Sequence, residues 1–205
     1  MAGHFFRSIA VVSATLLASS VLVKHHALAQ SGTLNELPEE AKEIANSVLN
    51  YCNDMGYDLN HDTATIENIG NNERGRNIIL FQPGDLCGYR DRGNGACSTD
   101  GCEFFVFSDH AGGQLTRIYQ RTASGVVGFP EDKNKPATIV FQSRGELKPC
   151  LGKREATCIV SLTWNGTKLI EKVIDNNPNS KFVKCMSNDN TQRQKISCVA
   201  KLIGR

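Results

Sequence analysis

The eight cysteines of this 205-residue chain constrain its fold more than any other feature. They are Cys52, Cys87, Cys97, Cys102, Cys150, Cys158, Cys185 and Cys198. An even number of cysteines in an exported chain favours a disulfide framework, whereas the same residues in a reducing compartment favour metal binding or catalysis. Their interpretation therefore depends on whether the chain is exported.

Residues 1–29 are organised like a cleavable secretory signal peptide. Arg7 is followed by an uncharged, mostly apolar run from Ser8 to Val23, and Ala27-Leu28-Ala29 is a small-x-small cleavage pattern. The apolar run is shorter than the roughly 20 residues that a spanning helix requires. We therefore predict a mature chain that begins at Gln30, is periplasmic or secreted, and has no membrane span after cleavage.

The spacing of the cysteines suggests how they pair, although eight cysteines allow 105 connectivities. Three close pairs each enclose a turn-like stretch, and Cys52 and Cys87 remain. We predict four disulfides, 97–102, 150–158, 185–198 and, by elimination, 52–87. A zinc site would need CxxC-type pairs with histidines, but only His61 and His110 lie in the mature chain. We expect neither a metal nor a cofactor.

Charge and length limit the partners and the number of domains. Cleavage removes Arg7 and Lys24 from the 23 basic side chains, which leaves 21 basic and 21 acidic side chains. This neutral total gives no electrostatic reason to expect nucleic acid or anionic lipid as a partner. We predict a polar leader over residues 30–36 and a single disulfide-rich α+β domain over residues 37–205.

One amphipathic helix is predicted near the start of the domain. Pro38 and two glutamates occupy its first turn, and Gly56 follows its last residue, Met55. Apolar residues at helical spacing predict a buried face made of Ala41, Ile44, Ala45, Val48, Tyr51, Cys52 and Met55.

Short β-branched and aromatic runs alternate with turn residues from position 57 onward. They predict strands near residues 64–69, 76–82, 103–108, 114–121, 125–129, 137–142, 157–164, 167–173, 182–186 and 195–202. Asn165-Gly166 predicts a hairpin with a two-residue type I′ turn. The predicted fold class is therefore α+β, with one N-terminal helix packed on an antiparallel sheet.

Two cysteine-closed loops are candidate binding segments, at residues 83–102 and 143–158. The first is the longest irregular stretch, and stiffened surface loops of this size often carry function. Its polar and aromatic residues form the candidate binding loop: Asp85, Tyr89, Arg90, Asp91, Arg92 and Asn94.

The order of these motifs resembles that of a group of exported bacterial proteins. The shared features are Cys87-Gly88, Gly101-Cys102 before an apolar strand, Cys150-x-Gly152, Cys158 and Leu162-x-Trp164-Asn165-Gly166. The group is uncharacterised, so the resemblance implies a fold and an exported location but no activity.

Motifs for catalysis and for calcium are incomplete. Ser108, Asp109 and His110 are neighbours in sequence, and adjacent side chains of a strand point to opposite faces, so they do not converge as a nucleophile and base must. The stretch that starts at Asp58 resembles the opening of a calcium loop, but Thr63 and Ile69 replace its glycine and glutamate.

Two function classes follow. The first is a non-catalytic binding module, inhibitor-like or envelope-interacting, for an unknown protein or glycan of the cell envelope. The alternative is a cell-envelope hydrolase that uses paired carboxylates, with Asp85, Asp100, Glu103 and Asp109 as candidates.

Overall fold

The computed structural model describes residues 30–31, 34, 37–59, 65–70, 76–89, 93–94, 96–98, 100–109, 113–144, 150, 157–187 and 190–205. The predicted signal peptide, residues 60–64 of the calcium-loop-like stretch and three residues of the candidate binding loop, Arg90, Asp91 and Arg92, lie outside these residues. Within them, no helix is long and apolar enough to cross a membrane.

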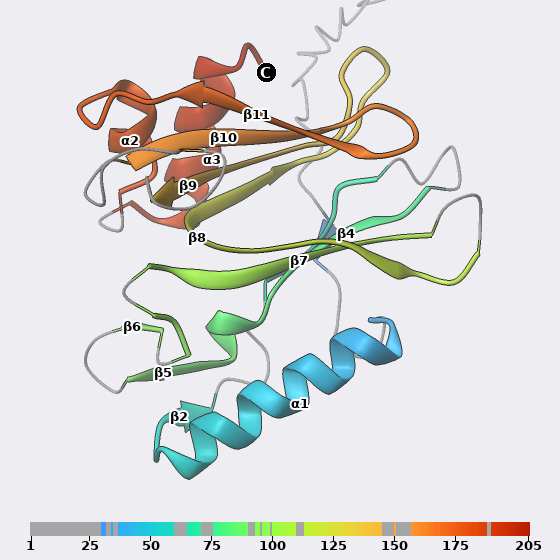
Figure 1. Cartoon of the computed structure of the whole chain (residues 1–205), viewed down its shortest axis with the longest axis vertical. Coiled ribbons are helices and arrows are strands. Elements are labelled where there is room, and N and C mark those ends of the chain that lie inside the picture. The colour runs from blue at the N-terminus through green and yellow to red at the C-terminus, as the bar shows by residue number, and fades with distance from the viewer. Residues whose placement is uncertain are drawn as a thin grey trace, which may run out of the picture.

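An antiparallel sheet of eight strands dominates the fold (Figure 1). In spatial order its strands are β1 (Gln30–Ser31), β3 (Thr65–Asn68), β4 (Ile78–Gln82), β7 (Cys102–Ser108), β8 (Thr116–Phe129), β9 (Thr138–Arg144), β10 (Thr157–Trp164) and β11 (Leu169–Asp175). A small second sheet contains β2 (Asp58–Leu59), β5 (Cys87–Tyr89) and β6 (Gly93–Asn94), and a 3₁₀ turn, Pro83–Leu86, leads into β5. The helices are α1 (Glu39–Asp54), α2 (Lys181–Cys185) and α3 (Gln192–Leu202).

The long strand β8 belongs to both halves of the large sheet. Its first part pairs with β7 and its second part with β9, and the register shifts between Ser124 and Val127. Gly125 lies in this shift at φ +63°. The predicted strands 114–121 and 125–129 are therefore one strand, because a bulge accommodates the glycine without ending the pairing.

Three hydrophobic clusters build the core. The largest lies between the two halves of the sheet, where Phe104 and Val106 of β7 meet Phe141 of β9 and Val160 of β10. The second lies between α1 and the outer face of β3, β4 and β7. The third lies between α2, α3 and the outer face of β8, β9 and β10. Helices thus cover the outer surface of each half (Figure 1).

Helix α1 begins and ends where the sequence predicts, but its buried face is narrower. Pro38 is the N-cap, and Gly56 follows the helix at φ +70°. Ala41, Ala45 and Cys52 are buried, whereas Tyr51 and Met55 are exposed. The prediction that these two residues face the core is wrong, because the sheet does not extend beneath the last turn.

The predicted single helix is also wrong, because residues 182–186 and 195–202 are helical. Thr191 and Gln194 form a capping box that starts α3, with each side chain bonded to the other's backbone N–H. The apolar side chains of Ile196 and Val199 have helical spacing and pack in the third cluster. The capping box and the helical spacing can be recognised in the sequence, but the β-branched residues of this segment also suit a strand.

The predicted β10–β11 hairpin is present, but its turn is longer than the predicted two residues. Trp164 pairs with Leu169, so the loop spans residues 165–168. The side-chain oxygen of Asn165 accepts the backbone N–H groups of Thr167 and Lys168 at 3.0 and 2.9 Å. These hydrogen bonds give a partner to two backbone N–H groups of the four-residue loop and so stabilise it.

Four disulfides join the pairs predicted from the spacing. Cys52–Cys87 ties α1 to β5, Cys185–Cys198 ties α2 to α3, Cys97–Cys102 closes a turn before β7, and Cys150–Cys158 is anchored at the start of β10. Both cysteines of the first pair are buried.

We predict that the Cys52→Ala/Cys87→Ala variant is less stable than the Cys97→Ala/Cys102→Ala variant. The sequence separations are 35 and 5 residues, so in the chain-entropy model the disulfides contribute about 4 and about 2 kcal/mol. For a domain of this size the difference lowers the thermal midpoint by about 4–8 °C. Calorimetry of both variants measures it, and the opposite order would show that the short loop anchors the core.

Candidate binding surface at the end of α1

Exposed apolar side chains gather where α1 ends. Tyr51 is 49% exposed, Met55 is 53% exposed and Leu59 is 38% exposed. Among the described residues only one other large hydrophobic side chain, Ile170, is exposed to a similar degree. We call Tyr51, Met55 and Leu59 the α1–β2 patch. Apolar groups that collect at one point of a surface mark contact sites more often than scattered ones do.

The Cys52–Cys87 disulfide positions this patch. Cys52 points into the core and bonds to β5, so its neighbour Tyr51 points outward. The backbone N–H of Tyr57 donates to the carbonyl of Cys52 at 2.8 Å, which turns the chain back towards β5. Leu59 then pairs with Cys87 in the small sheet. The disulfide and the strand pairing therefore hold the patch on a rigid support.

The candidate binding loop continues from this support. Asp85 lies in the 3₁₀ turn, Tyr89 ends β5 and Asn94 ends β6, which pairs with β5. The structure thus places the described backbone of the predicted loop beside the α1–β2 patch, with residues 87–89 and 93–94 in the same small sheet as Leu59. Sequence reasoning had placed Tyr51 and Met55 in the core and so missed the apolar part of this surface.

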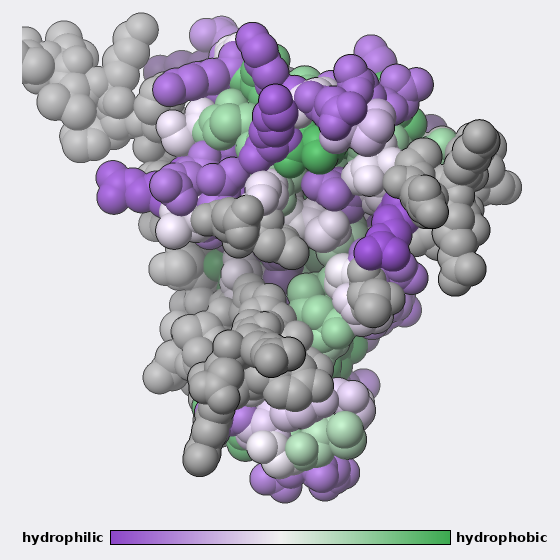
Figure 2. Space-filling view, turned by 90° about the vertical axis from the view of Figure 1, so that its left-hand side faces the viewer, coloured by the Kyte–Doolittle hydropathy of each residue, from purple (hydrophilic) through white to green (hydrophobic). Residues whose placement is uncertain are grey.

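The second candidate loop meets the first at the same end of the molecule. Arg144, the last residue of β9, forms an ion pair with Asp100 at 3.0 Å, and both side chains are about half exposed. The register across β7, β8, β9 and β10 also brings Cys102 and Cys158 to this end of the strands. Figure 2 views this end, where hydrophobic and weakly polar residues lie among hydrophilic ones at the lower edge, over α1 and β2.

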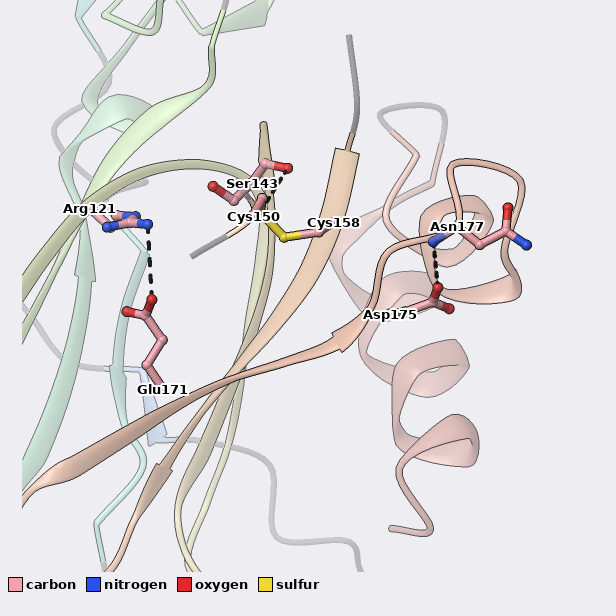
Figure 3. The surroundings of a disulfide bond; sticks show 7 residues. All are labelled: Arg121, Ser143, Cys150, Cys158, Glu171, Asp175 and Asn177. Atoms are coloured by element: carbon pink, nitrogen blue, oxygen red, sulfur yellow. Dashed lines mark hydrogen bonds and ion pairs between the residues drawn. A yellow bond between two sulfur atoms is a disulfide. The ribbon is translucent and has the colours of Figure 1, made fainter. Parts of the chain in front are cut away.

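A polar group joins the two halves of the sheet close to the Cys150–Cys158 disulfide (Figure 3). The hydroxyl of Tyr119 on β8 donates to Glu171 on β11 at 2.6 Å, and the guanidinium of Arg121 lies 4.0 Å from the same carboxylate. Burial, and then Glu171, raises the pKa of Tyr119. Among the described residues, two nitrogens of Arg121 and the hydroxyl of Ser143 are buried without a hydrogen-bond partner. The group links β8 to β11 through their side chains.

The carboxylates of the hydrolase alternative do not converge around Asp109. This residue is buried and accepts hydrogen bonds from the backbone and side-chain nitrogens of Asn77 at 3.0 and 2.6 Å. Glu103 lies six residues earlier, at the other end of β7, which is roughly 20 Å along a strand. Paired catalytic carboxylates lie within about 10 Å. Asp100 is paired with Arg144, and the Asp85 side chain lies outside the described part of the structure.

Glu67 on β3 is a buried carboxyl that sequence reasoning did not single out. It points into the space between the sheet halves, where the backbone N–H of Gly128 donates to it and one of its oxygens has no hydrogen-bond partner. Burial raises the pKa of Glu67 to about 7. A pKa near neutrality suits a general acid, but its surroundings are the apolar side chains of Ile69 and Leu80. In this position the Glu67 side chain covers the edge of β8 that has no strand partner in the described part of the chain.

Comparison with protein-family models, curated proteins and solved structures finds no match for this chain. The resemblance of its cysteine pattern to exported bacterial proteins therefore stays a prediction. Among the described residues, no group of three or more His, Cys, Asp or Glu side chains could hold a metal ion.

We predict that Glu67→Gln makes stability less dependent on pH. The folded protein binds this proton more tightly than the unfolded chain does, because the pKa rises from 4.5 to about 7. Unfolding free energy is therefore highest below pH 4.5 and falls as the pH rises to 7. The variant should match the parent at pH 4 and exceed its stability by up to about 3 kcal/mol at pH 8.

Denaturant unfolding at the two pH values measures this difference. The exposed Glu43→Gln substitution is the matched control and should change little at either pH. A Glu67→Gln variant that is less stable than the parent at pH 8 would show that the ionised carboxylate is stabilising.

Proposed function

We propose that this protein is an exported, non-catalytic binding module whose α1–β2 patch contacts a protein of the cell envelope. The observation that supports the proposal is the collection of three exposed apolar side chains beside the candidate binding loop. The four disulfides are typical of proteins in oxidising compartments and support the exported location.

The residue types of the patch suit a protein interface. Tyrosine and methionine are enriched at interface centres, and methionine adapts to irregular apolar partners. The Cys52–Cys87 disulfide and the β2–β5 pairing hold the patch in one arrangement before binding. Such preorganisation lowers the conformational entropy that association costs.

The ring geometry favours a protein partner over a glycan. Tyr51 and Tyr57 lie edge to face, with ring centroids 6.2 Å apart and an interplanar angle of 70°. Two rings in this arrangement do not form one flat platform on which successive sugar rings could stack. Met55 and Leu59 add aliphatic area, which suits apolar side chains of a partner protein.

The rim of the patch indicates the charge of the partner. Asp54 of α1 and Asp58 of β2, which adjoin the patch in sequence, are exposed. Rim charges contribute mainly to the association rate and to partner choice. We infer that the partner presents an apolar centre with basic residues around it.

Site-specific crosslinking tests the proposal. A photo-reactive phenylalanine analogue is placed at position 51 or, as the control, at position 170 in the full chain, expressed in the organism that makes the protein. Ile170 is a suitable control because it is 41% exposed and lies on β11 in the other half of the sheet. We expect a discrete protein adduct from position 51 and none from position 170.

A double substitution shows whether the patch supplies the affinity. Met55→Ser and Leu59→Ser should remove the position-51 adduct, whereas Ile170→Ser should leave it. Because these side chains are exposed, the thermal midpoints should change little. Equal adducts from both positions, or an adduct that survives the double substitution, would overturn the proposal. Enrichment on isolated envelope glycan that depends on Tyr51 would favour a glycan ligand instead.

A further inference from the structure

The neutral mature chain consists of an acidic half and a basic half. Residues 30–110 contain 14 acidic and 5 basic side chains, a net charge of −9. Residues 111–205 contain 7 acidic and 16 basic side chains, a net charge of +9. The net charge of residues 30–205 therefore does not describe the charge of any one surface. The expectation that charge indicates no partner is based on this net charge and does not hold for each half separately.

The fold keeps these halves apart in space. The acidic segment builds α1, β2 to β7 and the small sheet, which occupy the lower part of Figure 1. The basic segment builds β9 to β11, α2 and α3, which occupy the upper part. Within the described residues, the charges consequently form an electrostatic dipole with β8 near its middle.

Five exposed cations gather on the outer surface of the basic half. Lys172 lies on β11, Lys181 and Lys184 on α2, and Arg193 and Lys201 on α3. We call these residues the C-terminal basic face. The Cys185–Cys198 disulfide joins α2 to α3, and both helices pack with Ile174 of β11 in the third cluster. The three elements therefore form one continuous surface.

No ion pair joins the C-terminal basic face to a carboxylate within the described part of the chain. The two acidic side chains described in the C-terminal 49 residues have other neighbours: Glu171 meets Tyr119 and Arg121, and Asp175 accepts the backbone N–H of Asn177. Among the described residues, the cations therefore repel one another without a paired carboxylate. Such an arrangement raises the local concentration of anions.

We propose that the C-terminal basic face binds an anionic polymer of the cell envelope, a glycan that carries carboxylate or phosphate groups. Four of the five cations are lysines, which act as mobile point charges and suit repeated anions better than one planar group. A bilayer fits less well, because Ile170 is the one exposed large hydrophobic side chain described in this half, and peripheral helices insert several. This surface is separate from the α1–β2 patch.

Binding to polygalacturonate, a carboxylate polymer, tests the proposal with the full mature chain. We expect binding that weakens at least tenfold between 50 and 200 mM NaCl, because several charges are neutralised together. Neutral dextran of the same size should not bind. The Lys181→Gln/Lys184→Gln/Arg193→Gln variant should bind at least tenfold more weakly.

A control variant with the same change in net charge separates the face from the total charge. Lys42→Gln, Arg117→Gln and Lys133→Gln remove three exposed or half-exposed cations outside the C-terminal basic face. This variant should retain binding within about twofold, and so should Met55→Ser/Leu59→Ser, which tests the proposed function separately. Circular dichroism and thermal midpoints verify that each variant folds.

Several results would overturn the proposal. Equal weakening by the two triple variants would mean that only net charge matters, and equal binding to dextran would exclude an electrostatic site. Tighter binding to vesicles with anionic lipid than to polygalacturonate would identify a membrane instead. Salt-sensitive oligomers in sedimentation without polymer would show that the acidic half of a second copy occupies the face.

Discussion

The structure depends on a single strand that serves two layers of sheet. Among the described strands, the first part of β8 pairs only with β7, and the second part pairs only with β9 on the opposite edge. Each part of β8 therefore has one edge without a strand partner among them. A carboxylate from the facing half bonds each part of β8: Glu171 accepts from the side-chain hydroxyl of Tyr119, and Glu67 accepts the backbone N–H of Gly128. Of these two carboxylates, only Glu67 bonds a backbone group of β8. Unpaired strand edges invite association with other chains. Glu67 and Glu171 thus connect the two halves of the sheet, although the described strands do not form a closed barrel.

Placing Glu67 there constrains the residues around it. A Cβ atom on Gly128 would lie 2.6 Å from a carboxylate oxygen of Glu67, so only glycine allows the approach. The same closeness removes water from the carboxyl, which raises its pKa to about 7. A raised pKa in a cleft often marks catalysis, but structural networks also produce it. Here the carboxyl faces a backbone N–H and apolar side chains, which explains the pKa through folding alone.

The sequence predicts those features that depend on local chemistry, and it fails where the tertiary structure decides. The limits of α1 follow from Pro38 and Gly56, and three disulfides follow from close spacing. The exposure of Tyr51 and Met55 could not be read from periodicity, because it depends on where the sheet ends beneath the helix. Helix α3 could have been found from the Thr191 and Gln194 capping box, but Ile196 and Val199 also suit a strand.

The candidate functional site shows the same contrast between what local chemistry predicts and what the tertiary structure decides. The candidate loop residues Asp85, Tyr89 and Asn94 are predicted in an irregular stretch but lie in a 3₁₀ turn and two short strands, and the apolar side chains beside them come from α1 and β2. Net charge was misleading for a related reason, because a sum over the chain discards position. In this fold the described residues of 30–110 occupy one end and those of 111–205 the other, so sequence position and spatial position coincide. An apolar, acid-rimmed patch and a basic face can therefore occupy one small domain without neutralising each other.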